Sequence, residues 1–235
     1  MTHASPDERL AHRIVARELG WQPQMVRRFT AGLDFFVFDV SAGTSNVVVR
    51  IGRPRQSEVL RRGAALARQL RALGVALPEL ISLGTEDGFP FAIQSRLPGM
   101  DLGNIMNQLD AASLAGIARA VADAQSATAR LGDGARFGYA ASAKAAPHAS
   151  WADVVAAHIE RSALRIAASG FFPAEVVSRT EALFARHEAV LRHIPATPFL
   201  HDTTTKNVIV TPSGAFSGIV DVDELCFGDP RYAPA

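Results

Sequence analysis

The sequence contains a single cysteine, Cys226, in a chain of 235 residues. One cysteine cannot form an intrachain disulfide, which excludes a disulfide-held secreted scaffold and favours a reducing compartment. In an apolar context such a lone thiol is usually part of a core. No apolar run approaches the ~20 residues of a membrane span, and residues 1–20 carry too many charges for a signal peptide. We therefore expect a cytoplasmic protein with no membrane partner.

A strong excess of charge of one sign is also absent. The formal net charge is +1, and no run of like charges exceeds a few residues. Binding to a nucleic-acid backbone requires a basic surface, so nucleic acid is not an expected partner. Lysine is scarce and occurs only at Lys144 and Lys206. Any catalytic cation in the first half of the chain must therefore be an arginine.

The composition is that of a globular protein, with 48% hydrophobic and 20% charged residues, enough for one large domain or two lobes. The first ~100 residues predict strands over Phe35–Val40 and Asn46–Ile51, and then a helix over Leu60–Leu73. Two further strands are expected over Leu77–Leu83 and Phe89–Gln94, around a turn that contains Asp-Gly.

From Asp101 to about Arg192 the chain is alanine-rich and helical in period, with interruptions at 132–138 and 145–150. Proline ends this pattern, and strands are expected at Val208–Val210 and Gly218–Val222. The order of elements predicts an α+β fold of two lobes.

The predicted boundary between the lobes lies at residue 97. Residues 1–97 would form a small lobe with an antiparallel sheet, and residues 98–235 a mainly helical lobe. Clefts between lobes are favoured ligand sites, so we expect the functional site there.

Three oxygen-bearing side chains occur near the end of the chain. Asp202 lies at an expected strand end, Asn207 follows five residues later, and Asp221 comes after the expected hairpin. Phosphoryl transfer needs a carboxylate that orients the attacking hydroxyl and oxygen donors for Mg²⁺. The three residues could supply such a set, although each of them taken singly would usually be a turn residue.

Residues 199–230 resemble the aminoglycoside phosphotransferases and related small-molecule kinases, which carry HGDxxxxN, then an IDW-type segment ending in GDP. The residues around Asp223, Glu224 and Phe227 are most similar to the hygromycin phosphotransferase branch. The resemblance implies a protein-kinase-like fold that uses ATP or GTP with Mg²⁺. It places Asp202 as the catalytic aspartate and implies Asn207 and Asp221 as metal ligands.

The resemblance extends to the first half of the chain. Residues 29–40 are similar to the family's nucleotide loop, with Gly32 as their one glycine, and Arg50 lies where the family has a cation that contacts the α- and β-phosphates. The fork of an arginine suits phosphate oxygens. The family hinge, whose backbone holds the adenine, corresponds to Gln94, Ser95, Arg96 and Leu97.

The chain departs from the family pattern at three positions. Gly63 stands where a helix glutamate orders the phosphate-binding cation, and the nearest acid, Glu58, lies about one and a half helical turns earlier. Either Glu58 pairs with Arg50 or the ion pair is absent. Leu200 replaces the family histidine, with His201 displaced by one. Lys206 is either a catalytic cation that neutralises charge on the transferred group or a solvated loop lysine.

The chain stops at Ala235, shortly after Gly228-Asp229-Pro230, whereas relatives continue into helices that complete the acceptor pocket. If the native gene product continues past Ala235, we expect this chain to bind nucleotide but to transfer phosphate poorly, and to self-associate through uncovered apolar surface of the helical lobe. The acceptor could be an aminoglycoside or another antibiotic, a sugar or an amino alcohol. Three acidic residues follow Asp221 and are expected close to the acceptor site, Asp223, Glu224 and Asp229. Their negative charges favour a cationic acceptor.

Two alternatives remain. His201-Asp202 with His187, His193 and Asp221 could form the metal site of an HD-type phosphohydrolase, although that family sets the pair within helices and β-forming sequence follows here. The chain could instead be a pseudokinase or truncated remnant that binds nucleotide without turnover, because it lacks the helix glutamate and the C-terminal helices.

Overall fold

The structure, a computed structural model, describes residues 5–30, 34–173 and 175–232. Its contacts define two compact units. The first comprises Met1–Ala124 and Thr203–Asp223, and the second comprises Gln125–Asp202 and Glu224–Ala235. The division into functional lobes at residue 97 stays a prediction.

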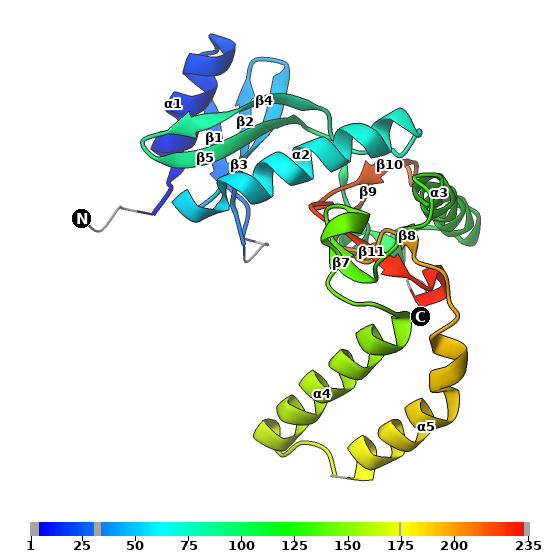
Figure 1. Ribbon diagram of the computed structural model, residues 1–235. Helices are drawn as coiled ribbons and strands as arrows, with labels where there is room; N and C mark the ends of the chain where they lie inside the picture. The colour runs from blue at the N-terminus through cyan, green and yellow to red at the C-terminus, as the bar shows by residue number, and fades with distance from the viewer. Residues whose placement is uncertain (1–4, 31–33, 174, 233–235) are drawn as a thin grey trace. The chain divides into compact units, whose positions relative to one another are not determined.

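The first unit contains a five-stranded antiparallel sheet with the order β1-β2-β3-β5-β4 (Figure 1). Its strands are β1 Met25–Arg28, β2 Phe36–Ala42, β3 Ser45–Ile51, β4 Leu80–Glu86 and β5 Phe89–Ser95. The predicted hairpin turns are confirmed. Asp87 and Gly88 join β4 to β5 with φ of 50° and 80°. Positive φ at both central residues is what a two-residue hairpin loop of this twist requires.

Helix α1, Glu8–Leu19, covers one face of this sheet, and the sequence analysis did not predict it. The helix begins at Asp7, whose side chain accepts a hydrogen bond from the Leu10 N–H at 2.9 Å, and it ends at Gly20 with φ 68°. Ile14 and Val15 are fully buried against the sheet residues Phe38 and Phe91. The stripe of buried residues explains why a helix rich in charge folds onto the sheet.

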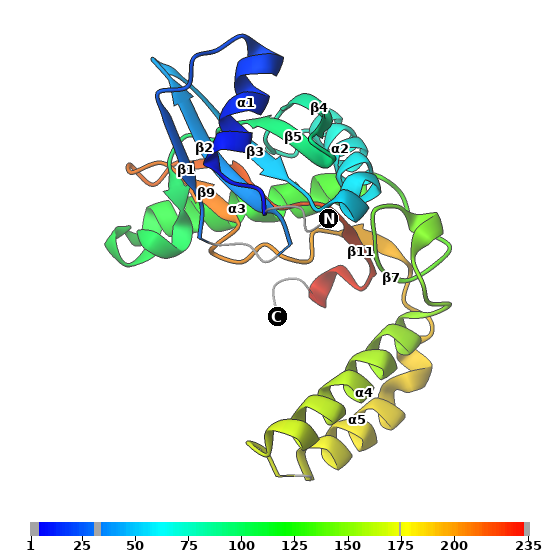
Figure 2. The same cartoon turned by 90° about the vertical axis from the view of Figure 1, so that its left-hand side faces the viewer.

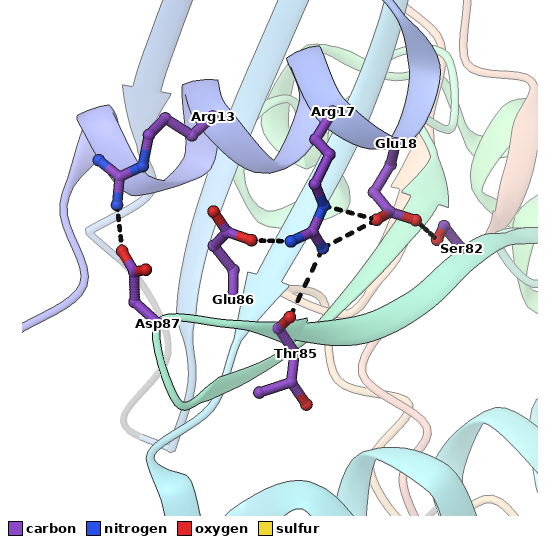
Figure 3. Close-up of polar contacts among 7 residues, drawn as sticks. All are labelled: Arg13, Arg17, Glu18, Ser82, Thr85, Glu86 and Asp87. Carbon is purple, nitrogen blue, oxygen red and sulfur yellow. Dashed lines mark hydrogen bonds and ion pairs between the residues drawn. The ribbon is translucent and has the colours of Figure 1, made fainter.

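Polar contacts fix the register of α1 on the β4–β5 hairpin (Figure 3). Arg17 lies against Glu86 and also donates to Glu18, and Arg13 pairs with Asp87 at the hairpin turn. The hydroxyl of Ser82 donates to Glu18, and this bond, with those from Arg17, lowers the pKa of Glu18. Both arginines and Asp87 are about half exposed, so these ion pairs contribute little and the buried apolar stripe supplies most of the stabilisation.

Helix α2, Ser57–Ala72, follows the short 3₁₀ turn Pro54–Gln56 and covers the opposite face (Figures 1 and 2). It confirms the predicted helix Leu60–Leu73, but begins three residues earlier and ends one residue earlier. On β3 the side chains of Val47, Val49 and Ile51 belong to the core under α1. Because side chains alternate along a strand, Arg50 points to the face that α2 covers.

The first unit also contains a small antiparallel sheet of β6 Met100–Asp101, β9 Val208–Val210 and β10 Phe216–Ile219, in the order β10-β9-β6. The predicted β9–β10 hairpin is confirmed, although β10 begins and ends earlier than Gly218–Val222. Two 3₁₀ turns follow β6, Leu102–Asn104 and Met106–Gln108, and helix α3, Ala111–Ala129, comes next. Ile117 of α3 packs in the core with Val208 and Val210.

The second unit combines a three-stranded antiparallel sheet with a helical hairpin. The sheet has the order β7-β11-β8, with β7 Gly138–Ala140, β11 Leu225–Gly228 and β8 Thr197–Phe199. Helices α4, Trp151–Ser169, and α5, Glu175–Leu191, run side by side (Figures 1 and 2). The helix α4 ends at Gly170 with φ 63°, a break that the sequence analysis did not predict.

The core of this unit holds Trp151, Val154, Phe199 and Cys226. Cys226 is fully buried, as expected for a lone thiol. Burial, together with the charge of Glu224, raises the pKa of Cys226 to about 12. The thiol therefore stays protonated and is structural. Across the described residues, no helix has both the length and the apolar character needed to cross a bilayer.

Candidate active site

The β9–β10 hairpin positions Asn207 and Asp221. Asn207 immediately precedes β9, and Asp221 comes two residues after β10. The Val220 N–H donates to the Asn207 carbonyl at 2.9 Å, and the Asn207 N–H donates to the Thr204 carbonyl at 2.9 Å. The two sequence-predicted metal ligands are thus brought to the same end of one hairpin.

Asp221 has a backbone conformation that L-residues other than glycine rarely adopt. Its φ is 63°, in the left-handed region, which aspartate tolerates better than most residues because its short side chain bonds locally. The side chain is 57% exposed and lies 3.1 Å from the Arg50 guanidinium. Strain of this kind concentrates at functional sites, which supports the choice of Asp221 as a ligand.

Arg50 is almost fully buried, with 8% of the residue exposed. Its guanidinium lies 4.6 Å from the centre of the Phe35 ring. Nη1 donates to Asp223 Oδ1 at 2.8 Å, and Nη2 donates to Asp223 Oδ2 at 2.5 Å and to Asp221 Oδ1 at 3.1 Å. Burial alone would lower the pKa of Arg50, but the bonds to Asp223, aided by the charge of Asp221, raise it. Arg50 therefore stays charged at any physiological pH.

The predicted pairing of Glu58 with Arg50 is wrong. Arg50 instead forms ion pairs with Asp223 and Asp221, which do not belong to the helix. Glu58 is exposed and pairs with Arg62 at 2.8 Å and with Arg61 at 3.6 Å. Five residues separate Glu58 from Gly63, which turns its side chain about 140° around the helix from that position. The carboxylates at Arg50 come from the segment after β10 instead.

The predicted hinge, Gln94–Leu97, is held through its backbone. The Ser95 N–H donates to the Glu79 carbonyl, and Ser95 Oγ accepts from the Glu79 N–H, both at 2.8 Å. The Arg96 guanidinium donates to the Leu97 carbonyl at 2.7 Å and pairs with buried Asp39 at 3.4 Å.

A small cavity of the first unit is lined both by Gln94 of the predicted hinge and by Arg50 with its two carboxylate partners. Its lining includes Leu60, Gly63, Gln94, Arg50, Asp221 and Asp223. Gly32, the predicted glycine of the nucleotide loop, lies outside the described residues. Lys206 is exposed in the turn before Asn207, a position compatible with both readings of this residue.

In the second unit, the segment that carries Asp202 follows β8. Phe199 and Leu200 are buried, and Asp202 is exposed. His201 meets the Tyr139 ring edge-on at 4.8 Å and lies 3.9 Å from Glu224. The buried side chain of Leu200 fills the position where the family has histidine.

Gln125, which the sequence analysis missed, holds the backbone next to Asp202. Its side-chain oxygen accepts from the Leu200 N–H at 2.9 Å, and its side-chain nitrogen donates to the Leu200 carbonyl at 2.7 Å. These two bonds fix the peptide two residues before Asp202. A glutamine in an otherwise alanine-rich segment was the only signal in the sequence.

We expect Gln125→Ala to lower the free energy of unfolding by about 1 to 3 kcal/mol, because it leaves both polar groups of a buried residue unpaired. Urea denaturation followed by circular dichroism measures this. Gln69→Ala, at an exposed position of α2, is the matched control and should stay within about 0.5 kcal/mol of the wild type. An unchanged urea midpoint for Gln125→Ala would mean that these bonds do not hold the loop.

The HD-type metal site is not formed. Among residues 5–30, 34–173 and 175–232, no group of three or more His, Cys, Asp and Glu side chains is placed to hold a metal ion. His201 and Asp202 lie between two strands, β8 and β9, and not within helices. Asn207 and Asp221 instead offer an amide oxygen and a carboxylate. These hard donors fit Mg²⁺, which usually takes one or two carboxylates and completes its shell with phosphates and water.

Comparison with known proteins identifies the family. The model of the phosphotransferase enzyme family (APH) matches residues 26–232. No curated protein matches the chain significantly.

Solved structures share the fold. One is the aminoglycoside phosphotransferase APH(4)-Ia, in a thermostable form crystallised with ADP and hygromycin B; at 18% identity and a TM-score of 0.66, the match covers 94% of this chain and 74% of that one. Another is a GDP complex of aminoglycoside 2'-phosphotransferase IIIa, at 15% identity and a TM-score of 0.71, covering 97% and 75%. A putative fructosamine-3-kinase from Haemophilus somnus has 12% identity and a TM-score of 0.62, covering 94% and 74%.

These likenesses confirm the predicted α+β, protein-kinase-like fold. The family match spans both units and includes every sequence-predicted site residue. The chain therefore belongs to the phosphotransferase enzyme family.

Proposed function

We propose that this chain transfers the γ-phosphoryl group of Mg-bound ATP or GTP to a hydroxyl group of a small molecule. The observation that carries the proposal is the buried guanidinium of Arg50, 3.1 Å from Asp221 on a hairpin end shared with Asn207. A fixed cation beside two oxygen donors suits a nucleotide triphosphate and its metal. Similar structures were solved in complex with ADP, AMP-PNP or GDP, which supports a nucleotide as the donor.

Each residue then has a distinct role. Arg50 contacts the α- and β-phosphates, and Asn207 and Asp221 hold the metal, which supplies positive charge against the phosphate oxygens. Asp202 orients the acceptor hydroxyl and accepts its proton. The hinge backbone at Gln94–Leu97 holds the base of the nucleotide, and Lys206 is proposed to stabilise charge on the transferred group.

The nature of the acceptor is open within the small-molecule class. APH(4)-Ia was crystallised with hygromycin B, which supports an aminoglycoside or a similar polyhydroxyl compound. The contacts weaken the case for a strongly cationic acceptor, because Asp223 is engaged with Arg50 and Asp229 pairs with Arg231 at 2.7 Å. The pair with Arg231 also lowers the pKa of Asp229. Glu224 remains as the exposed acid.

Isothermal titration with AMP-PNP and with a matching non-hydrolysable GTP analogue, each with and without Mg²⁺, tests the donor half of the proposal. We expect saturable binding that requires Mg²⁺. Arg50→Lys keeps the charge but loses the bidentate fork, so it should bind more weakly than the wild type. If neither nucleotide binds, or if binding does not depend on Mg²⁺, the proposal is contradicted.

Self-association is also kept as a proposal. Large apolar side chains are exposed along the α4–α5 hairpin, among them Leu164, Phe171, Leu183 and Val190. Exposed apolar patches favour association. Light scattering of the purified chain measures its oligomeric state.

A further inference from the structure

Arg50 has two carboxylate partners that differ in how firmly they hold it. Asp223 meets both outer nitrogens of the guanidinium, at 2.8 and 2.5 Å, and its side chain is 22% exposed. Asp221 makes one contact at 3.1 Å, and its side chain is 57% exposed. A bidentate, half-buried pair is stronger than a single contact in water. Asp223 is thus the firmer of the two partners of Arg50.

Gly63 provides the space that Asp223 occupies. A Cβ atom built at Gly63 would lie 2.7 Å from Asp223 Oδ1 and 3.4 Å from the Asp223 Cα. The first distance is shorter than real Cβ contacts allow, so any side chain at position 63 would displace the carboxylate. Glycine inside a helix is destabilising relative to alanine, and this close approach is the reason for one here.

Three residues of α2 that line the cavity beside Arg50 have small side chains or none. Gly63, Ala64 and Ala67 line the cavity that also exposes Arg50 and Asp223. A buried guanidinium needs a carboxylate partner, because a buried charge without one is strongly unfavourable. The residues of α2 that line the cavity beside Arg50 include no carboxylate. The segment after β10 supplies one, that of Asp223.

We infer that Asp223 is the positioning residue for the phosphate-binding Arg50 and takes the place of a carboxylate on α2. The lack of a side chain at Gly63 leaves the space that the Asp223 carboxylate occupies. This inference rests on the proposed function, since it assigns Arg50 to the nucleotide phosphates. With Asp223 holding one edge of the guanidinium, the remaining N–H groups keep a fixed direction. Nucleotide affinity is expected to depend on that direction.

The test is titration calorimetry with Mg·AMP-PNP on the full chain. Asp223→Asn keeps the shape and removes the charge, and we expect it to weaken binding about 10- to 100-fold, the range expected for losing a hydrogen bond between charged groups. Asp87→Asn makes the same change in the exposed β4–β5 turn and should leave the affinity unchanged.

Three further variants separate positioning from a general loss of stability. Gly63→Ala should weaken binding, because its methyl group displaces Asp223. The same substitution added to Asp223→Ala should cause no further loss, because its target is gone. Gly63→Glu combined with Asp223→Ala returns a carboxylate to α2 and should regain most of the affinity. Circular dichroism confirms that each variant is folded.

The outcomes divide clearly. If Asp223→Asn binds Mg·AMP-PNP as tightly as the wild type, the inference is overturned. Tighter binding would also overturn it, because it would mean that Asp223 competes with phosphate for Arg50. Additive effects of Gly63→Ala and Asp223→Ala, or no recovery by the carboxylate on α2, would also overturn it. If the wild type itself fails to bind Mg·AMP-PNP, the proposed function fails first and the positioning role falls with it. If the wild type binds Mg·AMP-PNP and the variants bind it with the same affinity, this inference alone is rejected and the proposed function stands.

Discussion

Replacing Asp202 by asparagine is expected to lower kcat for phosphoryl transfer by about 10²- to 10⁴-fold, the usual contribution of a positioned base. The segment that carries Asp202 is anchored upstream, because Phe199 and Leu200 are buried and Gln125 binds both polar groups of the Leu200 backbone. Asparagine fills the same volume but cannot accept a proton. The loss should therefore appear in kcat, with the affinity for Mg·AMP-PNP unchanged.

The measurement is a coupled assay of ADP release with an acceptor identified from a panel of hydroxyl compounds, together with calorimetry of nucleotide binding. Asp123→Asn, an exposed acid on α3, is the matched control and should keep wild-type turnover. If Asp202→Asn turns over an acceptor at the wild-type rate, then Asp202 is not the base, and another group must orient the hydroxyl.

Loss of the Asp221 carboxylate is expected to abolish the Mg-dependent stabilisation of the fold by nucleotide. At a nucleotide concentration 100 times Kd, the wild type should gain about 2.7 kcal/mol. For a chain of this length that gain raises Tm by about 5 to 11 °C. Asp221→Asn and Asp221→Gly should both lose this shift, because neither supplies a carboxylate to the metal.

The two substitutions at Asp221 separate ligation from backbone strain. The φ of 63° is strained for most residues, but glycine adopts it freely and asparagine tolerates it well. Both variants should therefore fold, and Asp221→Gly should be at least as stable without ligand as Asp221→Asn. Asn207→Ala is expected to reduce the thermal shift less, since it removes a neutral donor. A full Mg-dependent shift in Asp221→Gly would move the metal site elsewhere.

Much of the first unit could be predicted because its signals are local. The β4–β5 hairpin follows from alternating residues around Asp87-Gly88, and α2 follows from apolar residues at helical spacing after Pro54. The pairing of β9 with β10 could be predicted for the same reason. Helix α1 was missed because its many charges hid a narrow buried stripe, although Asp7 and Gly20 mark both of its ends.

The sheet of the second unit could not be predicted from local patterns. Its strands have three or four residues each and come from three distant parts of the chain, β7, β8 and β11. Strands this short carry almost no periodic signal. Their pairing is decided by the common core around Phe199 and Cys226, which only the folded chain reveals.

In the site, the scarcity of lysine led to Arg50, but nothing local led to its partner. Asp223 is 173 positions away in the sequence, and it was predicted only to be one of three acidic residues that favour a cationic acceptor. The informative signal was the glycine at position 63, which led to two alternatives, a pairing of Glu58 with Arg50 or no ion pair, and to neither Asp223 nor Asp221 as the partner. Since Asp223 supplies a carboxylate to Arg50, one of the two grounds for a pseudokinase is removed.

The most direct test of the account is whether the purified chain consumes ATP or GTP only when Mg²⁺ and a hydroxyl acceptor are both present. Phosphorus NMR of the reaction mixture follows the nucleotide and detects a new phosphomonoester on the acceptor. The account predicts acceptor-dependent formation of ADP or GDP with an equal amount of phosphomonoester, and loss of both signals in Asp202→Asn and Asp221→Gly. Tight Mg-nucleotide binding without a phosphorylated product from any acceptor in the panel would contradict the account and favour a chain that binds nucleotide without turnover.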